Sequence, residues 1–253
     1  MFLKIKILIA KLITMPWIGN IIKFCFSGKL KKYNLIFDIS SPMMSATNVA
    51  VLYWGMYESS EIRFIQKYFN DNSLDVIELG GSLGIVSSVI SKQKGSERNH
   101  IIVEANPHLI DTINKNLALN KAKNTTILNV ALPMQSNSKE VYFEIGESSL
   151  VSKIVSEPNA NTVAVPCKSL SNIIAENNIN NFALISDIEE AELGFLLNDS
   201  VALSKAKLIV IETHNIDFQN LNYSTEWMKA QFIDLGYTII DAHGPVYVFQ
   251  KNA

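Results

Sequence analysis

Apolar residues along this chain form two patterns: short continuous runs, and positions spaced three or four residues apart. Short runs bounded by polar residues or glycine are typical of strands that are buried on both faces of a parallel sheet. The runs that predict strands are DVIELG, HIIVEAN, TTILNVAL, FALISDIE and AKLIVIETH, at residues 75–80, 100–106, 125–132, 182–189 and 206–214.

Segments with helical spacing lie between these runs. They predict a helix that ends near Phe69 and further helices over residues 85–94, 107–120 and 170–178. Asn106 is expected to cap the helix at 107–120, which begins with a first-turn proline. This alternation predicts an α/β fold built on a doubly wound, mostly parallel sheet. The last two runs, YTIIDA and VYVFQK, flank a glycine and a proline and predict a C-terminal antiparallel hairpin.

The alternation stops between residues 133 and 166, where the sequence is mostly polar. Within this stretch EVYFEIG, at residues 140–146, has the pattern of a strand. Long insertions between core elements frequently carry function, so this region is predicted to face the substrate.

Composition and charge narrow the class of protein. A chain of 253 residues without compositional extremes predicts one main domain. Cys25 and Cys167 lie far apart, with no spacing typical of a disulfide framework or a zinc site, which favours a reducing, cytoplasmic location. Residues 1–34 carry seven lysines and no acid, so the remaining chain has a net charge of about −9. An acidic domain of this kind argues against nucleic-acid binding.

The basic start of the chain is predicted to be a helical segment, residues 1–34, that precedes a main domain at 35–253. Lys11 interrupts its apolar stretch and Pro16 follows soon after, which disfavours both a signal peptide and a membrane span. Two interpretations remain open. The segment either lies on an anionic membrane surface, at the inner face of the membrane, or packs as a helix on the main domain.

The stretch DVIELGGSLGIVSSV, at residues 75–89, fits more than one chemistry. As G-x-S-x-G it resembles a hydrolase nucleophile elbow with Ser82 as the attacking group. Asp187 followed by His214 or His243 could complete a triad, but no oxyanion-loop segment precedes the turn, so the hydrolase is disfavoured. The dinucleotide pattern G-x-G-x-x-G also fails, because Ser82 and Ile85 stand where glycines are required.

What remains is a glycine turn, with Gly80, Gly81 and Gly84, that lets the backbone approach a ligand closely. Glu104 ends the next strand twenty residues after Gly84, which is the spacing at which a carboxylate meets the ribose hydroxyls of a nucleoside. Together with the absent dinucleotide glycines, this predicts S-adenosylmethionine (SAM) as the cofactor.

The ordered motifs YWGMYESSE, VIELGGSLG, IIVEANP, NVAL, LISDIEEAE and LIVIETH resemble the FkbM family of methyltransferases. The resemblance implies a seven-stranded, Rossmann-like class I SAM methyltransferase fold. It also implies an acidic motif, Asp187 and Glu189, near the methyl group. The expected cofactor-binding residues are Glu78, Gly80, Gly81, Ser82, Gly84, Glu104 on the ribose, Asn106, and Asn129 to Ala131 beside the adenine.

The chain departs from the family pattern K-x-D-x-E-G-A-E, because Ile185 replaces the lysine and Glu190 replaces the glycine. Ser82 also stands where the family usually has asparagine. Without the lysine, less positive charge lies near the carboxylates of the acidic motif to balance their negative charge. This favours a bound metal such as Mg²⁺, a shifted carboxyl pKa or weakened catalysis, and the sequence leaves these three alternatives open.

Methyl transfer to a hydroxyl requires an aligned acceptor and a base that removes its proton. Asp187 is the first candidate for the base or a metal ligand, His214 is the second, and Glu189 and Glu212 rank lower. FkbM-like enzymes commonly O-methylate sugars or secondary metabolites, so the resemblance implies a small-molecule or glycan acceptor. The rival hypothesis is a non-catalytic SAM-fold protein that serves in binding or assembly. No oligomeric state is predicted.

Overall fold

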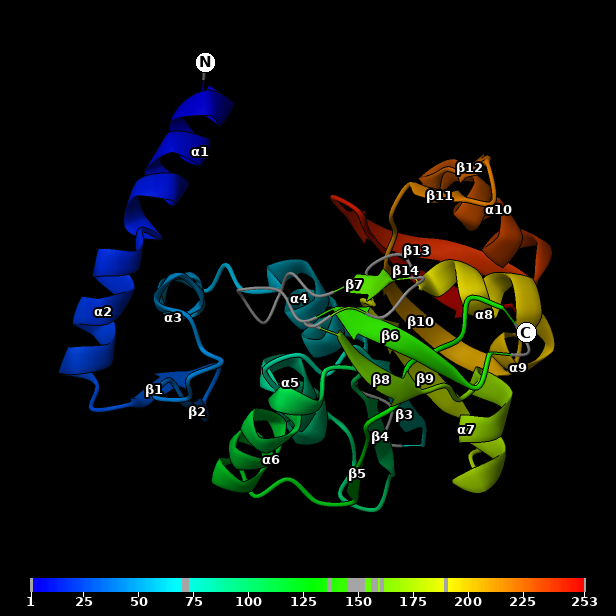
Figure 1. The fold of residues 1–253 in the computed structure, drawn as a ribbon, viewed down its shortest axis with the longest axis horizontal. Helices are drawn as coiled ribbons and strands as arrows, with labels where there is room; N and C mark the ends of the chain where they lie inside the picture. Colours follow the sequence, from blue (N-terminus) through cyan, green and yellow to red (C-terminus); the bar gives the residue numbers. More distant parts are fainter. Residues whose placement is uncertain are drawn as a thin grey trace.

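The computed structural model describes residues 2–69, 73–135, 138–144, 153–155, 159, 162–188 and 191–252 (Figure 1). Glu189, one of the predicted catalytic residues, lies outside these described residues.

A seven-stranded sheet forms the centre of the molecule, in the order β13-β14-β10-β9-β3-β4-β5. The strands are β3 (Asp75–Leu79), β4 (His100–Val103), β5 (Thr125–Leu128), β9 (Phe182–Ser186), β10 (Ala206–Glu212), β13 (Tyr237–His243) and β14 (Val246–Lys251). The strands β3, β4, β5, β9 and β10 pair in parallel with one another, and β14 pairs antiparallel with both β10 and β13. The predicted doubly wound sheet and its C-terminal hairpin are therefore confirmed.

Helices cover both faces of this sheet. They are α4 (Ser59–Tyr68), α5 (Ile85–Gln93), α6 (Ile110–Leu119) after the short 3₁₀ helix η1 (Pro107–Leu109), α7 (Leu170–Glu176), α8 (Glu192–Asn198), α9 (Ser200–Leu203) and α10 (Thr225–Asp234). Along β3, Val76 belongs to the core that contains α4, α5 and α6, whereas Ile77 and Leu79 belong to the core that contains α7 to α10. Alternate side chains of one strand thus enter two separate cores, as expected for a buried strand.

The strand β5, which follows α6, is shorter than its apolar run predicts. The run extends over residues 125–132, but β5 ends at Leu128. Asn129 leaves the ladder and donates from Nδ2 to the carbonyl oxygens of Glu104 (2.8 Å) and Ala105 (3.0 Å). Ala131 then forms an isolated bridge with Cys167. A side-chain amide that binds neighbouring backbone competes with strand pairing at this point.

The polar insertion forms a small antiparallel sheet of its own, in the order β7-β6-β8. Its strands are β6 (Glu140–Glu144), β7 (Lys153–Val155) and β8 (Thr162–Pro166). β6 confirms the strand predicted within residues 140–146. A further two-stranded hairpin, β11 (Ile216–Phe218) with β12 (Leu221–Tyr223), precedes α10.

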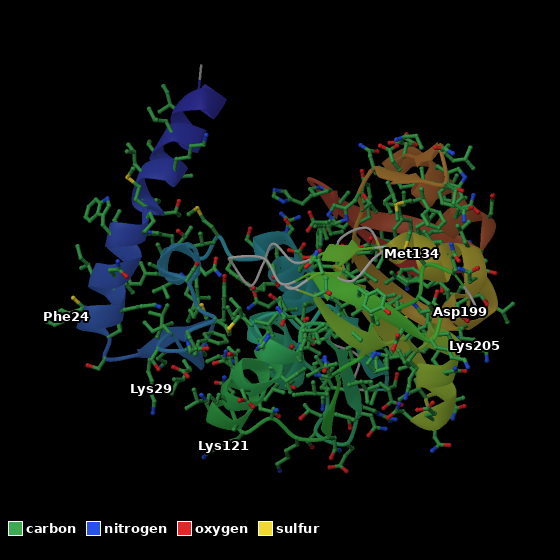
Figure 2. All side chains as sticks on the ribbon, in the orientation of Figure 1. Phe24, Lys29, Lys121, Met134, Asp199 and Lys205 are labelled. Atoms are coloured by element: carbon green, nitrogen blue, oxygen red, sulfur yellow. The ribbon has the colours of Figure 1, made fainter. Side chains whose placement is uncertain are left out.

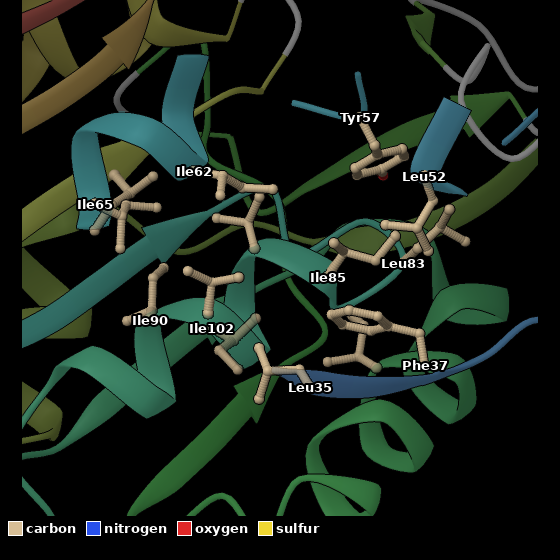
Figure 3. Packing of buried hydrophobic residues seen from close by; sticks show 14 of the residues in the cluster. Leu35, Phe37, Leu52, Tyr57, Ile62, Ile65, Leu83, Ile85, Ile90 and Ile102 are labelled. Atoms are coloured by element: carbon tan, nitrogen blue, oxygen red, sulfur yellow. The ribbon is translucent and has the colours of Figure 1, made fainter. Parts of the chain in front are cut away.

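The N-terminal part consists of α1 (Phe2–Ile13), α2 (Pro16–Cys25), the hairpin β1 (Lys29–Lys32) with β2 (Leu35–Asp38), and α3 (Ala46–Trp54). The hairpin spans the boundary expected at residue 34. Figure 3 shows Phe37 of β2 facing Leu83 and Ile85, all three of which belong to one core cluster. Figure 1 shows α2 beside α3 and α1 extending away from the rest of the molecule. Among the described residues, no helix has both the length and the apolar character to cross a membrane.

Candidate active site

The chain order in the sheet reverses between β3 and β9, because the chain runs from β3 outward to β5 and then returns to the other side of β3. In open α/β sheets, ligands bind at the carboxyl ends of strands beside such a reversal. The predicted site residues lie at these ends. Glu104 follows β4, Asp187 follows β9, and the glycine turn follows β3.

The glycines of the turn serve internal packing. A Cβ on Gly80, whose φ is +93°, would overlap the carbonyl oxygen of Asp187. A Cβ on Gly81 would lie 2.7 Å from a methyl group of Ile102, and one on Gly84 would lie 2.9 Å from Cα of Ile113. The turn is thus pressed against three neighbouring elements of the protein. From the sequence, these glycines are expected to let the backbone approach a ligand closely, and the structure shows that they also fit closely against the protein's own chain.

This close packing brings the turn to Glu104. Ser82, which has the unusual φ of +47°, donates from its backbone N–H to one oxygen of Glu104 at 2.7 Å. The backbone N–H of Asn106 donates to the other oxygen, also at 2.7 Å. Each carboxylate oxygen can accept more than one hydrogen bond, so both retain capacity for a ligand hydroxyl. These remaining acceptor positions on the carboxylate fit the donating hydroxyls of the ribose of SAM.

Burial raises the pKa of Glu104 to about 7, although the backbone hydrogen bonds from Asn106 and Ser82 favour the charged form. Its side chain is 7% exposed. A ligand that donates hydrogen bonds to this carboxyl would favour the ionised form and lower its pKa.

Two other predicted cofactor residues flank Glu104. Asn106 accepts the backbone N–H of His108 through Oδ1 (3.0 Å), while its buried Nδ2 has no hydrogen-bond partner among the described residues. A buried amide donor of this kind fits a polar ligand. Asn129 holds the backbone of residues 104 and 105 through Nδ2, and the predicted Ala131 is buried.

Glu78 lies inside the protein beneath the turn. One of its carboxylate oxygens accepts the hydroxyl of Ser87 (2.9 Å), and the other lies 2.8 Å from Nε2 of His100. Glu78 and His100 are both almost fully buried. Both oxygens of Glu78 therefore have partners within the protein, and the residue links β3 to α5 and β4.

Asp187, Glu212 and His214 form the second part of the site, at the ends of β9 and β10. Each offers one possible ligand atom, and these three atoms lie within 4.8 Å of one another. His214 is also near a third acid, since its Nδ1 lies 3.7 Å from Oε1 of the fully buried Glu192. Two carboxylates and an imidazole at this spacing can take a proton or hold a divalent cation.

Three further site residues, Tyr57, Glu58 and Glu61, had no assigned role in the sequence. The hydroxyl of Tyr57 lies 3.1 Å from Oγ of Ser82. Glu58 has the left-handed φ of +38°, and burial followed by the charge of Asp187 raises its pKa well above its usual value. Burial, opposed by a backbone hydrogen bond and reinforced by Glu212, raises the pKa of Glu61 to about 7. In the sequence, the two acids of the motif YWGMYESSE could have indicated these residues. In the same way, the last acid of LISDIEEAE could have indicated Glu192.

The sheet order, the glycine turn after β3 and the buried acid after β4 define a class I SAM-dependent methyltransferase. The family model described as the methyltransferase FkbM domain matches residues 78–239, which is more than half of the chain. The chain therefore belongs to the FkbM methyltransferase family.

Several solved methyltransferase structures are similar in overall arrangement. Precorrin-6y C5,15-methyltransferase from Geobacter metallireducens GS-15 has 16% identity and a TM-score of 0.42, over 77% of this chain and 89% of that one. M. jannaschii TYW2 in complex with AdoMet has 15% identity and a TM-score of 0.44, over 88% and 86%. Magnesium protoporphyrin IX methyltransferase from Synechocystis PCC 6803 with bound SAM has 10% identity and a TM-score of 0.44, over 82% and 83%. Among curated proteins, no sequence matches this chain.

Proposed function

We propose that this methyltransferase transfers the methyl group of SAM to a hydroxyl of a sugar or glycan-type acceptor. The observation that carries the proposal is the position of Asp187. Its carbonyl oxygen lies against Gly80 of the cofactor turn, and its carboxylate lies at the carboxyl end of β9, beside Glu212 and His214. A proton acceptor is thereby held next to the turn at which the methyl donor is expected to bind.

The residues divide into two sets with different tasks. Glu104 would accept the ribose hydroxyls, while Ser82, Asn106 and Asn129 hold its carboxylate and backbone in place. Bound SAM supplies an electrophilic methyl group on a sulfonium. With SAM bound, Asp187 would take the proton of the acceptor hydroxyl as its oxygen replaces the sulfur on the methyl group, and His214 is the alternative base. The products are the methyl ether and S-adenosylhomocysteine (SAH).

Family membership and charge support the choice of acceptor. FkbM-like enzymes commonly methylate sugars and secondary metabolites, and residues 35–253 carry a net charge of about −9, which disfavours nucleic acid. The small sheet of β6, β7 and β8 is the proposed substrate-facing insertion. A cytoplasmic location is proposed as well, and both cysteines are free thiols.

Incubation of the protein with methyl-labelled SAM and glycan fractions tests the proposal. We expect label in an alkali-stable methyl ether of a sugar, identified by mass spectrometry, together with SAH formation. Glycans from cells with and without the gene should differ by the same methyl group. SAM binding without transfer to any glycan or small-molecule fraction would instead support a non-catalytic binding or assembly protein.

We propose, as the alternative to a free base, that Asp187 is a ligand of a divalent cation such as Mg²⁺. Asp187, Glu212 and His214 would hold it, because carboxylate oxygens suit Mg²⁺ and an added imidazole also suits Mn²⁺. When bound, it would polarise the acceptor hydroxyl and compensate the acids that lack the family's lysine at Ile185.

Chelation should therefore lower methyl transfer, and added Mg²⁺ or Mn²⁺ should restore it. Isothermal titration calorimetry should show that EDTA changes SAH affinity by no more than a few-fold. The reason is that Glu104 and the glycine turn are not among the three residues that would hold the cation. Glu212→Gln should raise the cation concentration required for half-maximal activity. Activity that is indifferent to EDTA would leave Asp187 as a base that works without a metal.

A further inference from the structure

More than half of the large apolar side chains that are exposed among the described residues lie in the first 26 residues. We call them the N-terminal apolar surface; it consists of Ile5, Leu8, Ile9, Leu12, Met15, Trp17, Ile21, Phe24 and Phe26. Phe24 is 86% exposed and Trp17 is 58% exposed. Figure 2 shows Phe24 on the outer side of α2, away from the rest of the molecule. A soluble protein rarely exposes so many neighbouring apolar side chains unless they contact a partner.

These residues are placed by helical spacing. On α1, Ile5, Leu8, Ile9 and Leu12 are three or four positions apart, so they form one stripe. On α2, Trp17, Ile21 and Phe24 repeat the same spacing. The two helices therefore each present one apolar stripe that the described chain leaves uncovered.

The opposite side of α2 is fixed to the body of the protein. Gly19 and Ile22 are buried there, and a Cβ on Gly19 would overlap the carbonyl oxygen of Ala46 in α3. Lys23 donates to the carbonyl oxygen of Met44 (2.5 Å), and the indole N–H of Trp54 donates to the carbonyl oxygen of Ile13 (2.9 Å). The exposed stripe of α2 is thus the outer face of a helix that is already docked, and α2 cannot turn that stripe inward without losing these contacts.

Charge identifies the partner. Residues 1–34 carry seven lysines and no acid, and the side chains of Lys11, Lys29 and Lys31 are exposed. A second copy of the chain would bring this basic segment against an identical basic segment. Anionic lipid headgroups complement the lysines, while the acyl region accepts the aromatic and aliphatic side chains.

We propose that α1 and α2 lie in the interface of an anionic membrane, with the N-terminal apolar surface inserted among the lipids and the exposed lysines at the headgroups. The helices would lie on the membrane and not cross it, which agrees with their length and charge. The binding itself is independent of the methyl acceptor. Its use, holding the enzyme beside lipid-linked glycans, rests on the proposed function.

Flotation of the full chain with vesicles tests this proposal. We expect binding to vesicles of phosphatidylcholine with phosphatidylglycerol, weaker binding to phosphatidylcholine alone, and release as salt is raised. The double variant Trp17→Ser/Phe24→Ser should reduce binding by about tenfold or more, since it removes the two aromatic anchors. Val201→Ser is the matched control, because Val201 is 76% exposed on α9 and should not affect binding.

Lysine variants give a second measurement. Lys29→Gln/Lys31→Gln should weaken binding to the anionic vesicles and flatten its salt dependence, while SAH affinity stays unchanged for every variant. Absence of binding to either vesicle, or equal binding of the Trp17→Ser/Phe24→Ser variant, would overturn the proposal. So would a dimer that dissociates in this variant, because a second copy would then cover the surface. SAM binding and methyl transfer to a soluble acceptor are measured separately, so failure of lipid binding leaves the proposed function standing.

Discussion

Replacing Asp187 by asparagine should lower kcat about 100-fold or more and leave the Kd of SAM within a few-fold of the wild-type value. The size of the loss in turnover is that expected when a general base is removed. The substitution keeps the shape of the side chain, and the backbone of Asp187, which contacts Gly80 and donates to the carbonyl oxygen of Leu79, is unaffected. Steady-state kinetics and SAM calorimetry on the same preparation measure both quantities.

Asp234→Asn is the matched control, because Asp234 is an exposed residue at the end of α10 and should behave as wild type. His214→Gln should have the smaller effect of the two site variants. A different outcome would reassign the roles. If Asp187→Asn abolishes SAM binding while turnover per bound SAM stays normal, Asp187 belongs to the cofactor site and His214 becomes the leading base.

The second large effect is expected at Glu104. Glu104→Ala should weaken binding of both SAM and SAH by roughly 1.5 to 3 kcal/mol, because charge-assisted hydrogen bonds to the ribose are lost. Glu104→Gln should retain the side chain's volume and still weaken binding, since its NH₂ group cannot accept. Glu97→Gln, at an exposed acid, serves as the control. Unchanged affinity in both Glu104 variants would remove the residue from the cofactor site.

The pH dependence of binding follows from the same carboxyl. Its pKa is raised to about 7, so it is largely protonated at pH 6 and ionised at pH 8. The protonated form is the poorer acceptor for ribose hydroxyls, and SAH affinity should therefore fall about tenfold between pH 8 and pH 6 by linkage. Titration calorimetry at the two pH values measures this change. The Glu104→Gln variant should show little of it, and a flat wild-type profile would contradict the assignment.

The sequence predicts the parts of the fold that local pattern controls. Five apolar runs form the parallel strands, and the final pair of runs forms the antiparallel hairpin, because run length and flanking residues are local properties. The acids at strand ends were found for the same reason. Glu104 and Asp187 each follow an apolar run directly, and parallel strands bring their carboxyl ends to one edge of the sheet.

Other features depend on contacts between distant residues, which no local pattern encodes. The hairpin of β1 and β2 is held by Asn116 of α6 and by Asn120, which caps the end of α6. They accept the backbone N–H groups of Asp38 and Ile36, respectively, both at 2.8 Å. The spacing of glycines indicated a tight turn but could not distinguish contact with a ligand from contact with Ile102 and Ile113. Glu192 approaches His214 only because α8 follows β9 beside β10.

The candidate site has two parts: the glycine turn, and the group of Asp187, Glu212 and His214. Gly80 and the carbonyl oxygen of Asp187 are in close contact, so backbone atoms alone hold these two parts side by side. Side chains around this contact can therefore be exchanged without displacing either part. Ile185, two residues before Asp187, stands where the family pattern implied by the resemblance has lysine. We therefore expect that substitutions of side chains around this contact can change acceptor preference while the backbone spacing between Gly80 and Asp187 is kept.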